Sequence, residues 1–201
     1  ISIIFSQFHG LTTLALYMEK HTLPFNATKS LKNHLFITDL DGTLLRENAL
    51  LSTFAIEQLN LMIEQGLPFT AATARSITSV KEVLKGLELK LPVICSNGAY
   101  IADWNTGQHR FVNGLSKPYD RELLQLVKDC GFEPFMGTYD GETDHLFFGS
   151  NRNIGTQWYA DDRKRAEDRR LQVDVELEIA LEHQILSMNI YCENAKSSKK
   201  K

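Results

Sequence analysis

Apolar runs and helical spacings alternate along the first half of the chain. Apolar runs occupy residues 34–38, 67–73 and 91–98, and each is short enough for a strand. Between them, residues 52–66 and 76–87 carry apolar side chains at helical spacing. Strand, helix, strand, helix, strand with short links predicts a parallel sheet wrapped by helices.

The pattern of apolar and polar positions changes in the second half of the chain, and the new pattern predicts a separate α+β unit beginning near residue 114. Two hairpins are predicted, one around Asn105-Thr106-Gly107 and one around Asp140-Gly141. Helices are predicted over residues 117–131 and 156–170, and a strand over 183–192. The predicted organisation is an N-terminal extension (1–33), a first unit (34–113), an α+β unit (114–193) and a lysine-rich tail (194–201).

Composition is that of a soluble globular protein. The 201 residues are 43% hydrophobic and 23% charged, and a net charge of −3 gives no electrostatic reason to bind nucleic acid or an anionic membrane. Cys95, Cys130 and Cys192 are widely spaced without a CxxC motif, which predicts buried thiols in a reducing, cytoplasmic compartment rather than a zinc site. Trp104 and Trp158 are expected to be packing residues.

Residues 1–18 contain no Lys, Arg, Asp or Glu and leave two interpretations open. A signal peptide would need a basic start and a small-residue cleavage site, and neither is visible. Polar residues interrupt the stretch, which argues against a spanning helix. We expect an extension outside the domain, and a membrane tether is the alternative.

Polar side chains follow each of the three predicted strands. Asp39 and Asp41 follow the first, Thr73 and Arg75 the second, and Ser96 with Asn97 the third. In an open parallel sheet, ligands bind outside the carboxyl ends of the strands. Three polar strand ends therefore predict a site for a charged ligand.

Two carboxylates one residue apart should raise the pKa of one of them unless a cation intervenes. Mg²⁺ would resolve the conflict, because it is held by one or two carboxylates and keeps several waters. One carboxylate could then attack an electrophile while the other, protonated, acts as general acid. Gly42 lets the chain turn, so that backbone N–H groups can cradle an anion. A calcium loop is excluded, since Thr43 and Leu50 stand where acidic ligands belong.

Three segments together resemble the Cof-type branch of the haloacid dehalogenase (HAD) superfamily over about residues 34–193. They are DLDGTLL (39–45), FTAATARS (69–76) and VICSNGAYI (93–101). The resemblance implies an α/β fold, with a Rossmann-like parallel core (incomplete here) and an inserted α+β cap (partial here). It implies a phosphatase that hydrolyses a small phosphorylated metabolite with Mg²⁺.

The resemblance also assigns roles to individual residues. Asp39 would be the nucleophile that forms an aspartyl-phosphate, and Asp41 the general acid/base. Mg²⁺ would bind the Asp39 carboxylate and the Asp41 main-chain carbonyl. Thr73 would hydrogen-bond the transferring phosphoryl group. The remaining phosphate-binding candidates are Gly42, Thr43, Ala74, Arg75 and Asn97.

The sequence departs from this family pattern in two respects. Ala74 replaces the glycine common in the second motif. The lysine of the third motif and the Gly-Asp of the fourth are not found, so weak metal binding and slow turnover are expected. Lys81, Lys85 and the acids of residues 140–144 are the substitutes considered, although solvated or turn roles fit them better. The alternative is therefore an impaired or inactive domain that at most binds phosphate.

The 34–38 strand is expected to lie at a sheet edge, because the family's later strands come after the cap. An apolar edge with unpaired backbone groups is a template for self-association. Residues 1–5 or 11–18 could lie against that edge and cover it.

Overall fold

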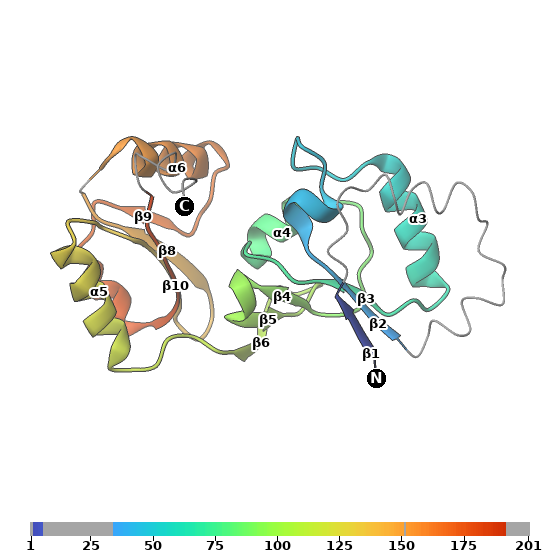
Figure 1. The fold of residues 1–201 in the computed structure, drawn as a ribbon, viewed down its shortest axis with the longest axis horizontal. Coiled ribbons are helices and arrows are strands. Elements are labelled where there is room, and N and C mark those ends of the chain that lie inside the picture. Colours follow the sequence, from blue (N-terminus) through green and yellow to red (C-terminus); the bar gives the residue numbers. More distant parts are fainter. Residues whose placement is uncertain (1, 6–33, 151, 192–201) are drawn as a thin grey trace, which may run out of the picture. The chain divides into compact units, whose positions relative to one another are not determined.

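The computed structural model describes residues 2–5, 34–150 and 152–191 (Figure 1). The chain divides into two compact units, residues 1–112 and residues 113–201, and each is described by itself.

A three-stranded parallel sheet forms the centre of the first unit. Its order is β1 (Ser2–Phe5), β2 (His34–Thr38), β3 (Phe69–Ala71), and Figure 1 shows β1 beside β2. A parallel bridge between Ala72 and Ile94 continues the arrangement to the next strand. The parallel sheet predicted for this half of the chain is therefore present.

The strand after β3 also begins an antiparallel sheet. This sheet has the order β4 (Val93–Cys95), β5 (Tyr100–Ala102), β6 (His109–Val112). The predicted hairpin around Asn105-Thr106-Gly107 joins β5 to β6, and Gly107 has φ +80°.

The pairing of β1 with β2 corrects one expectation and confirms another. β2 is not an edge strand, because Ser2 pairs with His34 and Phe5 with Ile37 in parallel register. Coverage by residues 1–5 is thus confirmed, whereas the alternative segment, residues 11–18, lies outside the described residues.

Two helices of the first unit begin at serine caps. α3 (Thr53–Glu64) starts where the Ser52 hydroxyl accepts a hydrogen bond from the Ala55 N–H, and α4 (Ile77–Val83) starts in the same way at Ser76. The predicted apolar faces are buried, through Ala55, Leu59, Ile63, Val80, Leu84 and Leu87, while Met62 and Val83 are half-buried.

The second unit is built on a four-stranded sheet of order β10-β7-β8-β9. Its elements along the chain are α5 (Tyr119–Asp129), β7 (Phe135–Tyr139), β8 (Asp144–Phe148), α6 (Ile154–Arg165), β9 (Leu171–Val173), a 3₁₀ turn (Leu177–Glu182) and β10 (Gln184–Asn189). The pairs are antiparallel except β8 with β9.

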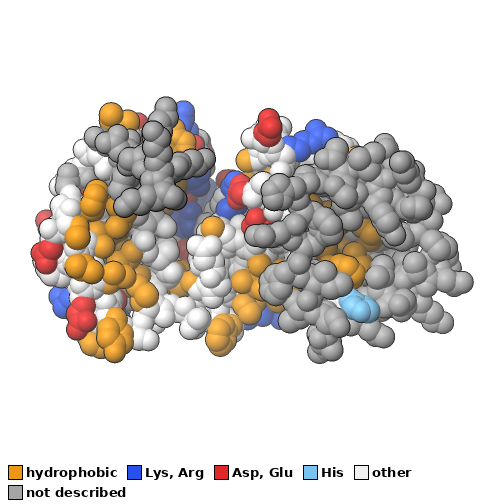
Figure 2. Space-filling model, viewed as in Figure 1, with side chains coloured by type: hydrophobic (Ala, Val, Ile, Leu, Met, Phe, Trp, Pro, Cys, Tyr) orange, Lys and Arg blue, Asp and Glu red, His pale blue; other side chains and the backbone are white. Residues whose placement is uncertain are grey.

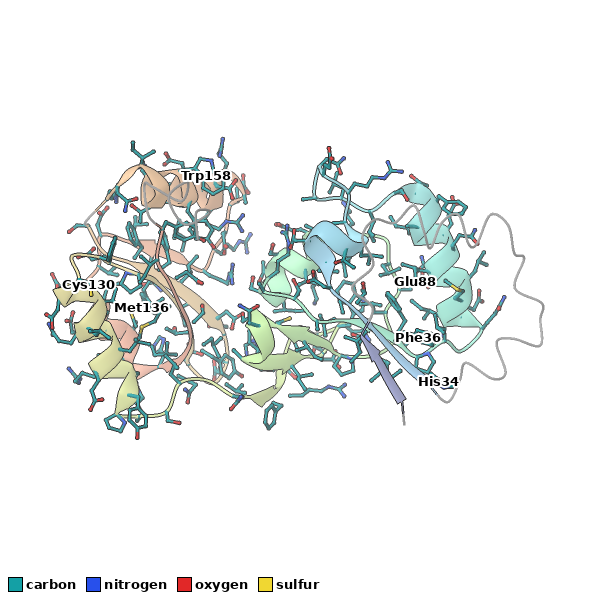
Figure 3. All side chains as sticks on the ribbon, viewed as in Figure 1. His34, Phe36, Glu88, Cys130, Met136 and Trp158 are labelled. Atoms are coloured by element: carbon teal, nitrogen blue, oxygen red, sulfur yellow. The ribbon has the colours of Figure 1, made fainter. Side chains whose placement is uncertain are left out.

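Helices cover both faces of this sheet. Successive side chains along a strand point to opposite faces, and both faces of these strands carry apolar side chains that need cover. On one face, Met136 and Phe147 pack with Leu124 of α5. Met136 is labelled in Figure 3. On the other face, Phe135 and Phe148 pack with Ala160 of α6. The second unit therefore has a core on each side of one sheet.

Some expectations about the second unit were wrong. β9 and the 3₁₀ turn were not predicted, because each is shorter than the window over which periodicity can be read. Trp158 of α6 is 60% exposed and not a packing residue. Cys130 is exposed rather than buried, Cys95 is buried as expected, and Cys192 lies outside the described residues.

Apolar side chains also lie on the surface of the second unit. Figure 2 shows hydrophobic atoms over α5, where Tyr119 and Leu126 are exposed. In the whole of the described part of the chain, α5 included, no helix has the length and apolar character needed to cross a bilayer. The mixed α/β fold class predicted from the sequence is confirmed.

Asp103 organises the β5–β6 hairpin. Its carboxylate accepts hydrogen bonds from the N–H groups of Asn105 (3.0 Å) and Thr106 (2.9 Å) and pairs with Arg110. The Thr106 N–H, followed by Arg110, lowers the pKa of Asp103 from 3.8 to about 2.

This shift predicts how hairpin stability depends on pH. A carboxyl whose pKa is lower in the folded state stabilises the fold above its unfolded pKa, and that contribution disappears as the pH falls through about 2. We expect Asp103→Asn to destabilise the protein at pH 6, with the difference from wild type shrinking between pH 4 and 2. Urea unfolding at a series of pH values measures it, and a difference that grows on acidification would contradict it.

Candidate functional site

The chain turns sharply directly after β2. Residues 40–44 form a tight turn closed by the Leu45 N–H donating to the Leu40 carbonyl at 2.9 Å. Gly42 has φ +74°, a conformation that L side chains rarely adopt. Leu40 and Leu44 are buried, while Asp39, Asp41 and Gly42 are exposed. The apolar residues of the turn are therefore packed in the interior, whereas its acids are exposed to solvent.

Asp39 occupies the first position after β2. The Thr43 hydroxyl donates to its Oδ2 at 3.3 Å, and the Thr38 hydroxyl donates to its main-chain carbonyl at 2.8 Å. Among the described residues, no basic side chain pairs with Asp39. Its carboxylate is therefore exposed, and within the described part of the chain a single hydroxyl, that of Thr43, donates to it.

Asp41 has a very different environment. Arg75 binds it with two parallel hydrogen bonds, Nε to Oδ2 and Nη2 to Oδ1, both 2.7 Å long. The Asp41 side chain is 53% exposed and that of Arg75 is 24% exposed. A bidentate guanidinium–carboxylate pair fixes both the position and the orientation of the carboxylate, so the Asp41 side chain is held in place.

The pair determines the charge of both partners. Hydrogen bonding from Arg75 lowers the pKa of Asp41, and hydrogen bonding to Asp41 raises the pKa of Arg75. The sequence predicted that crowding of Asp39 and Asp41 would raise the pKa of one acid unless a cation intervened. At Asp41 the shift has the opposite direction, because the intervening cation is an arginine from the end of the next strand.

Ser79 completes the arrangement and was not predicted. Its hydroxyl, on α4, accepts a hydrogen bond from Arg75 Nη1 at 3.1 Å, and Ser79 is buried. The signal available in the sequence was its position four residues after Arg75, on the helix that begins at Ser76.

The ends of the three predicted strands are joined through their backbones. The Ala72 N–H donates to the Thr38 carbonyl at 2.8 Å, and the Asn97 N–H donates to the Thr73 carbonyl at 3.0 Å. The Ser96 N–H donates to the Arg75 carbonyl at 3.0 Å. The structure therefore brings the predicted residues to one sheet edge.

Three further candidates line these strand ends. Thr73 is 5% exposed, and its hydroxyl accepts a hydrogen bond from the Arg75 N–H at 3.2 Å. Ala74 is exposed. Asn97 is exposed in a left-handed conformation (φ +56°). Thr73 is thus the buried member of the group, and Ala74 and Asn97 face solvent.

The substitutes for the missing motifs have structural roles. Lys81 donates to the Asn105 carbonyl at 3.0 Å. Asp140 accepts hydrogen bonds from the N–H groups of Glu142 and Thr143, both 2.8 Å, and pairs with His145 at 2.7 Å. Across residues 2–5, 34–150 and 152–191, no three His, Cys, Asp or Glu side chains gather in a way that could hold a metal.

The chain belongs to the haloacid dehalogenase-like hydrolase family. The sequence profile of that family matches residues 36–200, which include every candidate site residue named in this section. The resemblance inferred from the three motifs is therefore confirmed.

Comparison with curated proteins points to phosphatases. The pyridoxal phosphate phosphatase YbhA of Escherichia coli K12 is 36% identical over 118 residues, which cover 56% of this chain and 43% of that protein. A Mycoplasma genitalium protein, provisionally named a phosphatase, is 31% identical over 124 residues, covering 62% of this chain and 42% of its own length. The chain spans less than half the length of these relatives.

Solved structures show the same fold at low sequence identity. A haloacid dehalogenase-like hydrolase from Bacillus subtilis has a TM-score of 0.51 at 20% identity, covering 83% of this chain and 56% of that one. A Plasmodium vivax protein, provisionally described as a HAD/COF-like hydrolase, has a TM-score of 0.58 at 21% identity, covering 82% and 58%.

The bidentate pair of Arg75 with Asp41 predicts what happens when the arginine is replaced. In Arg75→Gln without divalent cations, the pKa of Asp41 should rise toward 3.8, since its strongest hydrogen-bond donor is lost. Carboxyl ¹³C NMR titration measures this directly. Arg110→Gln, which removes the partner of Asp103 instead, should leave the pKa of Asp41 unchanged. An unaltered Asp41 titration in Arg75→Gln would contradict the prediction.

Proposed function

We propose that the protein is a Mg²⁺-dependent phosphatase, which hydrolyses a small phosphorylated metabolite through an aspartyl-phosphate on Asp39. Membership of the haloacid dehalogenase-like family and the phosphatase names of its relatives support the reaction class. The name of the E. coli relative makes pyridoxal phosphate the first substrate to try.

The observation that carries the proposal is the contrast between the two aspartates. Asp39 is exposed, and among the described residues its carboxylate accepts a hydrogen bond from one hydroxyl, that of Thr43, whereas Arg75 donates to both carboxylate oxygens of Asp41. A nucleophile must be free to reach phosphorus, and an acid/base must be fixed in place. The environments therefore favour Asp39 for attack and Asp41 for proton transfer.

The donors around Asp39 suit a phosphoryl group. The Thr43 hydroxyl lies beside the Asp39 carboxylate, the turn around Gly42 offers main-chain N–H groups, which can cradle an anion, and the Thr73 hydroxyl lies buried at the end of β3. Ala74 and Asn97 lie at neighbouring exposed strand ends. The Arg75 guanidinium adds a positive charge beside the site, although Asp41 offsets it.

The oxygen donors of this turn also suit Mg²⁺. The Asp39 carboxylate is accessible, and Mg²⁺ is characteristically held by one or two carboxylates, waters and substrate phosphate oxygens. We assign the Asp39 carboxylate and the Asp41 main-chain carbonyl as its protein ligands. A bound Mg²⁺ would neutralise charge on the transferring phosphoryl group.

The proposed reaction has two displacements at phosphorus. An Asp39 oxygen forms a bond to phosphorus as the bond to the leaving alkoxide breaks. Asp41 supplies the proton that the leaving oxygen needs once its carboxylate has separated from Arg75 and taken up a proton, because the pairing with Arg75 lowers its pKa. Water then attacks the aspartyl-phosphate, gives a proton to the Asp41 carboxylate and releases phosphate, which regenerates Asp39. Arg75 keeps the Asp41 carboxylate oriented for this second proton transfer.

Single substitutions should separate the two roles. With p-nitrophenyl phosphate and Mg²⁺, Asp39→Asn should lower kcat by at least about 10³-fold, because the amide cannot serve as the nucleophile. Asp41→Asn should lower kcat by about 10²–10⁴-fold, the usual contribution of a general acid/base. Phosphate release measures both.

The matched control is Glu47→Gln, which removes an exposed negative charge a few residues beyond the turn. It should leave kcat unchanged, which separates chemistry from overall charge. Binding of beryllofluoride with Mg²⁺, followed by ¹⁹F NMR, gives a readout independent of turnover and should be lost in Asp39→Asn. Full activity of Asp39→Asn would overturn the nucleophile assignment.

A further inference from the structure

The Arg75 guanidinium lies at the end of a long side chain whose base is fixed. The Arg75 N–H donates to the Thr73 hydroxyl at 3.2 Å, and the Arg75 carbonyl accepts a hydrogen bond from the Ser96 N–H at 3.0 Å. These contacts do not fix the rotatable bonds of the side chain, and ordering those bonds costs conformational entropy. The position of the guanidinium therefore depends on the acceptors that surround it.

Two side chains accept hydrogen bonds from this guanidinium. Asp41 accepts from Nε and Nη2, both at 2.7 Å, and the Ser79 hydroxyl accepts from Nη1 at 3.1 Å. In the proposed reaction, the Asp41 carboxylate separates from Arg75 before it delivers a proton. Among the described residues, Ser79 is then the side chain that still accepts a hydrogen bond from Arg75.

The guanidinium also has another direction in which to turn. Glu82 lies three residues after Ser79 on α4, and its negative charge acts on Arg75 as well. An arginine that Asp41 has released is attracted toward that carboxylate. The hydrogen bond from Nη1 to Ser79 opposes this movement, so that Arg75 stays in place to receive the Asp41 carboxylate again.

Ser79 is itself well fixed. It is buried, and its N–H donates to the hydroxyl of Ser76, the residue that caps α4, at 3.4 Å. The backbone of Ser79 thus takes part in the cap, whereas its side chain accepts from Arg75. Replacing Ser79 with alanine therefore removes the contact to Arg75 and leaves the cap of the helix in place.

Tyr100 of β5 holds the start of the same helix. It is fully buried, and its hydroxyl accepts a hydrogen bond from the Ile77 N–H at 2.9 Å. The first N–H groups of a helix have no partner within the helix, and this contact satisfies one of them. The Tyr100 ring stacks on His109 of β6, with 3.7 Å between the ring centroids. The β5–β6 hairpin therefore supports the turn of α4 that carries Ser79.

We propose that Ser79 and Tyr100 are positioning residues of the candidate site. Tyr100 fixes the first turn of α4, and Ser79 on that turn keeps the Arg75 guanidinium in place whether or not Asp41 is paired with it. The benefit to catalysis rests on the proposed phosphatase function. The positioning itself is measured on Arg75 without turnover, so the two claims can fail separately.

The test follows the mobility of Arg75 after Asp41 has been removed. In the full chain carrying Asp41→Ala, ¹⁵N relaxation at Arg75 Nε gives an order parameter, which reports motion on the ps–ns timescale. Ser79→Ala and Tyr100→Phe are added to this background, singly and together, and each removes one hydroxyl. Thr78→Ala is the matched control, because it removes an exposed hydroxyl from the neighbouring position of α4. Backbone spectra check that each variant is folded.

With Asp41→Ala alone, the order parameter should stay near that of a rigid group, about 0.85. Adding Ser79→Ala should lower it below about 0.6, the range of flexible groups. Adding Tyr100→Phe should lower it by a smaller amount, and should have no further effect once Ser79→Ala is present, because Tyr100 acts through Ser79. Adding Thr78→Ala should leave it unchanged.

Three results would overturn the proposal. A flexible Arg75 in Asp41→Ala alone would mean that Ser79 does not hold the guanidinium. An order parameter that Ser79→Ala leaves high, or that Thr78→Ala lowers equally, would mean that the Ser79 hydroxyl is not responsible. An Arg75 unaffected by Tyr100→Phe would remove Tyr100 from the positioning. A wild-type protein without phosphatase activity would contradict the proposed function, and the Arg75 measurement would still decide this inference.

Discussion

Two carboxylates one residue apart at the end of β2 are the constraint around which the site of the first unit is arranged. Arg75 pairs with Asp41, and no basic side chain among the described residues pairs with Asp39. Asp39 is left accessible, with the Thr43 hydroxyl beside it. The pairing with Arg75 thus distinguishes two chemically identical residues. The Asp41 carboxylate is fixed, and the Asp39 carboxylate is accessible.

That arginine can reach Asp41 only because the strand ends are held together. β2 and β3 pair in parallel, and the loop after β3 is joined by backbone hydrogen bonds to the turn after β4. The Ser79 hydroxyl, in the first turn of α4, accepts a hydrogen bond from Nη1 of the Arg75 guanidinium. The acids, the arginine and the serine therefore come from the turn after β2, the loop after β3 and α4, and each is placed by backbone geometry.

Much of this could be predicted from the sequence, because the relevant patterns are local. Apolar periodicity gives α3 and α4, serine caps give their starts, and parallel strands bring Asp39, Thr73 and Asn97 to one edge. The Asp41–Arg75 pair could not be predicted, since it joins residues 34 positions apart through a particular rotamer. β9 has only three residues, which is too short a segment for its apolar pattern to predict a strand. The pairing of β1 depends on a register that no turn specifies.

The central claim is that Asp39, and not Asp41, receives the phosphoryl group, and covalent trapping tests it most directly. Protein incubated with acetyl phosphate and Mg²⁺ is quenched in acid and reduced with borohydride, which converts an aspartyl-phosphate into homoserine. Peptide fragmentation then locates the homoserine. The account predicts it at position 39, with Asp41 unmodified. Homoserine at position 41, or at neither position, would contradict the account.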